Sequence, residues 1–112
     1  MTGQVRLTRR ALRDLEEVRH YTEEIWGEAQ WLRYFSAIQT GFDRITADPM
    51  CGQSRGQFLR GMRSLTVGRH LIFFIPVQHA DGDVVVSRIV HQSRNLKALT
   101  YSEGPPPKPT HS

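Results

Sequence analysis

The chain has 112 residues, which is the length of one small domain with a single core. Hydrophobic residues make up 38% of it, and no apolar run approaches the roughly 18–20 residues that a membrane-spanning helix needs. The net charge of +4 at pH 7 favours an anionic partner, such as nucleic acid or an acidic peptide.

Cys51 is the only cysteine, so no internal disulfide can form. Met1–Arg10 has no apolar stretch behind its charges, so we expect no signal peptide. Both features are typical of a protein of the reducing cytoplasm, which is the location we predict. We find no HxxxH motif, CxxC motif or paired carboxylate that suggests a metal site, so we expect neither a metal nor a cofactor.

Charge is unevenly distributed along the chain. Acidic residues crowd the first third, and no glutamate lies between Glu28 and Glu103. From Arg55 to Arg94 the charged residues are arginines, apart from two aspartates. The sequence therefore predicts an acidic segment followed by a basic one.

The predicted elements begin with a short strand over Gln4–Thr8, where apolar and polar residues alternate. Thr8 can also cap a helix, because its hydroxyl can accept a hydrogen bond from an early backbone N–H. A helix is predicted from Arg9 to Ile25, since apolar residues recur there at intervals of three and four. The stripe consists of Ala11, Leu15, Val18, Thr22 and Ile25.

A second helix is predicted from Glu28 to Ala47, directly after Gly27, which is expected to form an αL cap. It ends before Pro49, because the residue that precedes a proline disfavours the helical conformation. Gly41 lies inside this helix at a cost of about 1 kcal/mol relative to alanine. We expect close approach of the first helix to be the reason. The short connection makes the two helices antiparallel neighbours.

Three strands are predicted in the second half of the chain. Met62–Val67 alternates apolar and polar residues. Arg69–Val77 and Val84–His91 are typical of an antiparallel hairpin, with Asp81-Gly82 as its turn. Because Leu71–Ile75 is continuously apolar, we expect both faces of this strand to be covered.

The predicted order is β-α-α-β-β-β, in which a helical hairpin packs on one face of a small, mostly antiparallel sheet. This is an α+β architecture. Residues 1–101 are assigned to this single domain, in which residues 49–57 form a loop that Phe58-Leu59 anchors. Residues 102–112 are rich in proline and are predicted to be a disordered tail.

Several short motifs follow one another along most of the chain, from about Val5 to Leu99. They are Ala11-x-x-Asp14-Leu15, Tyr21-Thr22, Trp26-Gly27, Asp48-Pro49, Gly61-Met62-Arg63, Gly68-x-His70, Ile72-Phe73-Phe74 and Arg88-Ile89-Val90-His91-Gln92. Their order and spacing resemble the ParE branch of the RelE/ParE toxin superfamily.

The resemblance implies the toxin of a bacterial type II toxin–antitoxin pair. Toxins of the ParE type poison DNA gyrase by trapping or blocking it, which favours a gyrase inhibitor over a ribonuclease. The resemblance further implies a hetero-oligomeric complex with a cognate ParD-like antitoxin, which binds operator DNA through its own ribbon-helix-helix end. The toxin itself would touch neither membrane nor operator.

A second function follows from RelE-like relatives of the same fold, which cut mRNA on the ribosome. A metal-free ribonuclease needs an acid, a base and cations near the scissile phosphate. The candidates are Arg63, Arg88 and His91. The predicted sheet offers no lysine and no glutamate, so we favour binding over cleavage and expect no catalytic residue. A third possibility is a basic domain that only regulates transcription.

Two sets of contact residues are predicted. The first is a basic patch that would meet the target, formed by Arg60, Arg63, Arg69, Arg88, His91 and Arg94. For Arg63 and Arg88 the alternative is an ion pair with an acid of the first helix, Asp14 or Glu17, or simple solvation. For His91, as for His70, the alternative is a structural role at a strand end.

The second set would bind the antitoxin. The two helices hold more large apolar residues than one buried stripe per helix can accommodate, and the surplus predicts an exposed patch. An amphipathic antitoxin segment laid along the helical hairpin would cover it, with acidic residues to meet the arginines. The residues of this set are Tyr21, Trp26, Trp31, Leu32, Tyr34 and Phe35.

Overall fold

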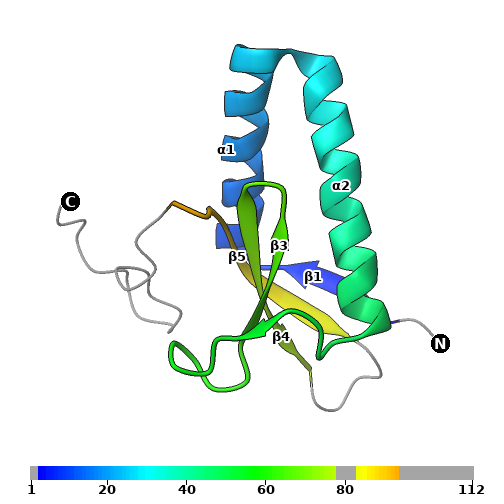
Figure 1. The fold of residues 1–112 in the computed structure, drawn as a ribbon, viewed down its shortest axis with the longest axis vertical. Helices are drawn as coiled ribbons and strands as arrows, with labels where there is room; N and C mark the ends of the chain where they lie inside the picture. The colour runs from blue at the N-terminus through cyan, green and yellow to red at the C-terminus, as the bar shows by residue number, and fades with distance from the viewer. Residues whose placement is uncertain (1–2, 78–82, 94–112) are drawn as a thin grey trace, which may run out of the picture.

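The structure, a computed structural model, describes residues 3–77 and 83–93 (Figure 1). Its elements are β1 (Val5–Leu7), α1 (Arg9–Trp26), α2 (Glu28–Ala47), β2 (Gln53–Ser54), β3 (Arg63–Val67), β4 (His70–Pro76) and β5 (Val84–His91). The predicted turn Asp81-Gly82, Arg94 and the predicted boundary between residues 101 and 102 lie outside the described residues.

The strands form one sheet in the order β1-β5-β4-β3-β2. β1 runs parallel to β5, and the other neighbours are antiparallel. The two helices form an antiparallel hairpin whose connected end extends well past the sheet (Figure 1). The predicted α+β class is confirmed. The sheet has one more strand than predicted, since the two-residue β2 lies in the predicted loop.

Both faces of β4 are covered, as its continuous apolar run predicts. Ile72 and Phe74 belong to the core that includes residues of both helices. Leu71 and Phe73 belong to a second buried cluster. The predicted anchor Phe58-Leu59 packs against this second cluster.

The register between β4 and β5 shifts by one residue at Ser87, which has no cross-strand partner. The shift lets Val86 and Ile89, three positions apart, share the core that contains the helices. Such a bulge reverses the face on which each later side chain lies. It also places His91 directly opposite His70.

The helix bounds agree with the prediction to within one residue. Thr8 caps α1 as predicted, because its Oγ1 accepts a hydrogen bond from the Ala11 N–H at 3.0 Å. The same hydroxyl donates to the Ser87 carbonyl at 2.9 Å, which ties the start of α1 to β5. Within the described part of the chain, neither helix has the length and apolar character required to cross a membrane.

Three predictions about the helices are corrected. Gly27 has the positive φ expected at the junction, 91°, but its ψ of 167° is extended, so it does not form an αL cap. Ile25, predicted to lie in the buried stripe, is exposed because the end of the hairpin extends beyond the sheet. Gly41 faces the sheet and not α1: a Cβ there would lie 2.7 Å from Cγ2 of Val67.

Candidate functional site

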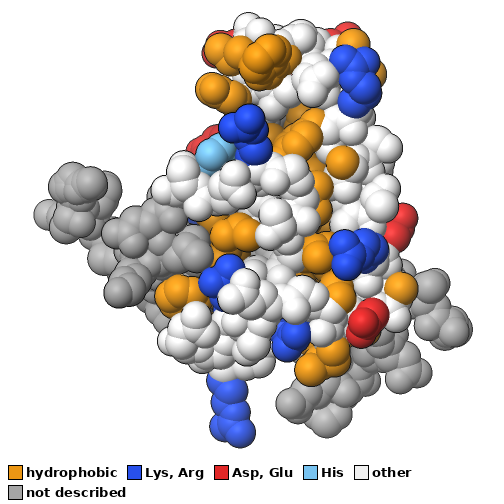
Figure 2. All heavy atoms as spheres, in the orientation of Figure 1, with side chains coloured by type: hydrophobic (Ala, Val, Ile, Leu, Met, Phe, Trp, Pro, Cys, Tyr) orange, Lys and Arg blue, Asp and Glu red, His pale blue; other side chains and the backbone are white. Residues whose placement is uncertain are grey.

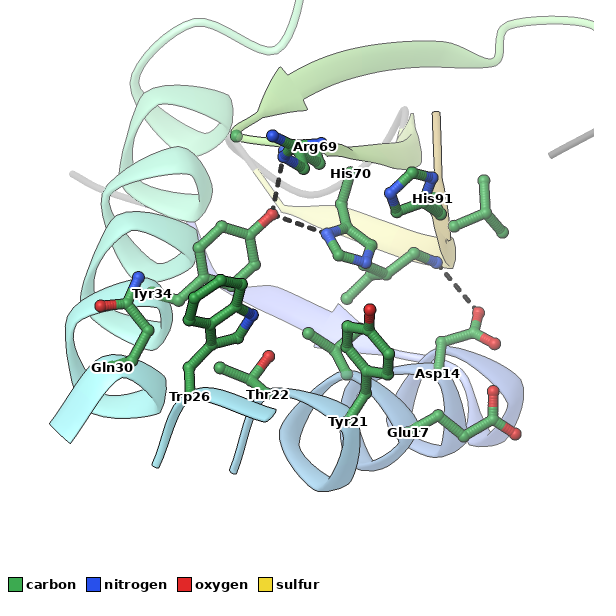
Figure 3. Close-up of a pocket in the computed structure, with 14 residues that line it drawn as sticks. Asp14, Glu17, Tyr21, Thr22, Trp26, Gln30, Tyr34, Arg69, His70 and His91 are labelled. Atoms are coloured by element: carbon green, nitrogen blue, oxygen red, sulfur yellow. Dashed lines mark hydrogen bonds between the residues drawn. The ribbon is translucent and has the colours of Figure 1, made fainter. Parts of the chain in front are cut away.

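A groove lies between the helical hairpin and one end of the sheet (Figure 3). α1 and the first half of α2 form one wall, which carries the exposed aromatic side chains of Tyr21 and Trp26. The turn between β3 and β4 and the paired ends of β4 and β5 form the other wall, with Arg69, His70 and His91. We call the sheet side, with Arg69, His70 and His91, the polar wall. The helical wall combines its aromatic side chains with polar ones, among them Asp14, Glu17 and Thr22. Such a mixed composition is found in protein-binding surfaces.

Tyr34 joins the two walls. Its hydroxyl lies 3.0 Å from the Val67 carbonyl, 3.1 Å from the Arg69 N–H and 2.6 Å from Nδ1 of His70. Burial raises the pKa of Tyr34, and the hydrogen bond from Arg69 opposes this effect. The tyrosine therefore acts as a neutral hydrogen-bonding centre that fixes α2 to the β3–β4 turn.

Gly68 makes this contact possible. It has a φ of 56°, a left-handed conformation that favours glycine. A Cβ at this position would lie only 2.6 Å from Cε1 of Tyr34. Both the shape of the turn and the close approach of the ring therefore require glycine.

His70 and His91 lie side by side on the polar wall, with ring centroids 5.4 Å apart in an edge-to-face arrangement. Burial lowers the pKa of His70 to about 4, and His91 adds to this effect, whereas Asp14 opposes it. His70 is therefore neutral at pH 7.

The hydrogen position on His91 follows from its partner. Nδ1 of His91 lies 3.1 Å from the backbone nitrogen of Ser93, and a backbone N–H can only donate. Nδ1 is therefore the acceptor, and the neutral ring carries its hydrogen on Nε2.

Asp14 is a buried carboxylate at the base of the groove, and it is held by cations. Arg88 donates to it through Nε at 2.8 Å and through Nη2 at 3.3 Å, and Nε of Arg10 lies 3.5 Å away. The backbone N–H of Ile89 donates to the same carboxylate at 3.0 Å. For Arg88 the structure thus shows the ion pair that was the alternative to target contact.

The three candidates for ribonuclease chemistry do not form one cluster. Arg88 is buried against Asp14. Arg63 donates to the Cys51 and Gly52 carbonyls at 3.0 and 3.2 Å, and so holds the segment before β2. Arg63 pairs with Phe74 and His91 with His70, so the two candidates are offset by four residues, or about 13 Å, along β4 and lie on opposite sides of this strand.

The remaining members of the predicted basic patch are distributed differently. Arg69 and His91 lie together at the polar wall of the groove. Arg60 is exposed in the loop before β3, and Figure 2 shows the described arginines as separate blue areas and not as one patch on this face.

The predicted antitoxin-binding residues lie in three different surroundings. Tyr21, Trp26 and Leu32 are 65%, 68% and 57% exposed, and they lie near the connected end of the hairpin, where hydrophobic side chains gather in Figure 2. Trp31 is buried and stacks on the partly buried Phe35, with ring centroids 5.3 Å apart. The sixth, Tyr34, is partly buried at the centre of the groove.

The groove also contains residues that the sequence did not single out as contact residues. Thr22 and Gln30 line it, and His70, expected to be structural, stands on its wall. The pairing of His70 with His91 depends on the bulge in β5, for which the sequence offers no marker. Among residues 3–77 and 83–93, no group of three or more His, Cys, Asp or Glu is placed to hold a metal ion.

The chain is similar in sequence to proteins of one known family. The family model described as the ParE toxin of the type II toxin–antitoxin system, parDE, matches residues 5–96. Toxin ParE1 of Caulobacter vibrioides is 32% identical over 93 residues, which cover 83% of this chain and 93% of that protein.

Two solved structures share the fold. A chain of the chromosomal ParDE system from P. aeruginosa has a TM-score of 0.65 and 18% identity, over 80% of this chain and 96% of that one. A chain of the toxin–antitoxin complex RelBE2 from Mycobacterium tuberculosis has a TM-score of 0.59 and 19% identity, over 84% and 95%. The family match spans most of the chain, and it confirms the resemblance: this protein belongs to the ParE toxin family of type II toxin–antitoxin systems.

Proposed function

We propose that this protein inhibits DNA gyrase by binding it, and that a cognate ParD-like antitoxin neutralises it. Family membership supports a toxin. The observation that favours binding over RNA cleavage is the placement of the ribonuclease candidates. Arg63 and Arg88 are both engaged by the fold, and neither is clustered with His91. Cleavage would require an acid, a base and cations around one phosphate.

The antitoxin is proposed to lie in the groove, across the exposed aromatic side chains of the helical wall. Tyr21 and Trp26 supply apolar area that an amphipathic segment can bury. Arg69 and His91 belong both to this groove and to the predicted target patch. An antitoxin in the groove would therefore cover residues that the target needs, which accounts for neutralisation.

The proposal also covers the DNA-binding domain of the antitoxin and the place where the toxin acts. The antitoxin is expected to carry a ribbon-helix-helix domain and to make all contacts with operator DNA within a hetero-oligomeric complex. The toxin is expected to act in the cytoplasm, where it meets gyrase.

The test is a gyrase supercoiling assay with the purified protein, with and without its antitoxin, beside a ribosome-dependent mRNA cleavage assay. We expect loss of supercoiling or an accumulated cleavage complex, reversal by the antitoxin, and intact mRNA. Normal supercoiling together with cut mRNA would replace the proposal with an mRNA interferase. His91→Ala would then be the first variant to examine, because His91 is the one candidate exposed in the groove.

A further inference from the structure

Two ring nitrogens in the groove, Nε2 of His70 and Nε2 of His91, have no hydrogen-bond partner among the described residues, although both Nδ1 atoms do. His70 is partly buried and His91 is exposed, and both line the groove (Figure 3). A few convergent polar atoms on the wall of a largely apolar site are the usual means of fixing a bound group.

The Tyr34 hydroxyl indicates where His70 carries its hydrogen. It has one hydrogen and two lone pairs, and one lone pair accepts the Arg69 N–H. If its hydrogen goes to the Val67 carbonyl, the other lone pair can accept a hydrogen from Nδ1 of His70, and every group is satisfied. If its hydrogen goes to Nδ1, the Val67 carbonyl loses this bond. The first arrangement makes one more bond and leaves Nε2 of His70 as a bare acceptor.

On the sheet side of the groove the charged group next to His70 in the chain is a cation, Arg69, whereas the two acids of the lining, Asp14 and Glu17, both come from α1. The charged and titratable groups that line the groove with His70 are Asp14, Glu17, Tyr21, Tyr34, Arg69 and His91. Asp14 is already paired with Arg88 and Arg10. Arg69 has no ion pair among the described residues. The polar wall thus offers a cation and a ring N–H, beside a histidine that can still accept a proton.

We propose that this polar wall binds one carboxylate side chain of the antitoxin, and that His70 takes up one solvent proton at Nε2 as the carboxylate binds. The inference rests on the proposed seating of the antitoxin in the groove. Because the proton adds to Nε2, the bond between Nδ1 and Tyr34 is kept. The product is an imidazolium–carboxylate pair, to which Nε2–H of His91 can add a second hydrogen bond and Arg69 a nearby positive charge.

Proton uptake makes binding depend on pH in a defined direction. In the free protein the pKa of His70 is about 4, and a carboxylate nearby raises it. Between the free and the bound pKa, the complex holds more protons than its separated parts, so affinity increases as the pH falls. We expect roughly five- to tenfold tighter binding at about pH 5.5 than at about pH 7.5.

Calorimetric titration of the full-length protein with its full-length antitoxin tests this inference. The titration is carried out near pH 6 in two buffers with different ionisation enthalpies, because the difference in observed heat gives the number of protons taken up. We expect net uptake by the unaltered protein and its loss in His70→Gln. His20→Gln is the matched control, since His20 is an exposed histidine of α1 outside the groove, and it should keep the uptake.

Nitrogen-detected NMR of the His70 ring gives a second readout that needs no variant. We expect a neutral ring with its hydrogen on Nδ1 in the free protein and an imidazolium in the complex at about pH 6. A complex that forms without proton uptake, with His70 neutral, would overturn this inference and leave the proposed antitoxin site standing. If no complex forms, both are overturned.

Discussion

Asp14 supplies a hydrogen-bond acceptor to the outer edge of β5, where a neighbouring strand would normally supply it. β1 pairs only with Val84–Val86, and beyond the contact between Thr8 and the Ser87 carbonyl the outer edge of β5 has no neighbouring strand. The carboxylate of Asp14 reaches this edge from α1, accepts the Ile89 N–H and neutralises Arg88. One side chain thus satisfies a free sheet edge and a buried guanidinium at the same time.

We predict that Asp14→Ala lowers the free energy of unfolding by about 3–5 kcal/mol. The change would leave the Arg88 guanidinium buried without a counter-charge and the Ile89 N–H without its acceptor. Chemical denaturation followed by circular dichroism measures the effect.

An exposed ion pair provides the control. Arg19 and Glu23 form a pair on the surface of α1, and Glu23→Gln should cost less than about 1 kcal/mol. Adding Arg88→Met to Asp14→Ala should recover part of the loss, because the uncompensated charge is removed. Equal costs for Asp14→Ala and Glu23→Gln would show that the buried pair is not structural.

His70 predicts a second pH effect, on the stability of the free protein. Its pKa is lowered from 6.5 to about 4 in the fold, mainly by burial. As the pH falls below 6.5, the unfolded chain binds the proton first, so stability decreases between about pH 6.5 and 4. His70→Gln should flatten this part of the stability profile, measured by denaturation at a series of pH values. An unchanged profile in the variant would assign the pH dependence to other groups.

At the scale of elements, Gly41 decides how closely α2 approaches the sheet. In an ordinary helix, alanine is favoured over glycine by about 1 kcal/mol. Here an added Cβ would lie 2.7 Å from a methyl group of Val67 and in ordinary contact with Ile72 and Leu65. The gain in helix propensity therefore competes with overpacking against Val67, and overpacking costs about 1–3 kcal/mol.

We predict that Gly41→Ala is destabilising and that Val67→Ala removes the penalty. In the Val67→Ala background the clashing methyl is absent, so Gly41→Ala should be neutral or slightly stabilising there. A double-mutant cycle by chemical denaturation gives the coupling between the two positions. Additive effects would mean that α2 shifts to accommodate the methyl group.

Local residue chemistry explains why most elements were predictable. The two helices begin and end next to residues that favour helix ends, namely Thr8, Gly27 and Pro49. β2 was not predictable, because two polar residues gain strand structure only through their partners in β3. The reason for Gly41 was also predicted wrongly, since its neighbour is set by tertiary packing and not by the adjacent helix.

At the scale of the whole molecule, the exposed aromatic part of the groove exists because the helices are longer than the sheet they cover. The hairpin extends past the strands, so the aromatic residues near its connected end have no core to enter (Figure 1). Amphipathic spacing could predict surplus aromatic residues, but not that Trp31 is buried while Trp26 is exposed. The polar wall was harder to predict, because His70 and His91 meet only through the shifted register of β5.

This geometry leads to a prediction about the complex. Trp26→Ala should weaken antitoxin binding by roughly 30-fold or more, as expected for an exposed aromatic anchor that the partner buries. It should leave the stability of the free toxin nearly unchanged, because the side chain is 68% exposed. Leu12→Ala is the matched control, since Leu12 is a 51% exposed apolar residue of the same helix that does not line the groove. Calorimetry measures the affinity of both variants for the antitoxin. Equal affinities would mean that the antitoxin binds elsewhere and that the exposed aromatic residues at the connected end of the hairpin take no part in neutralisation.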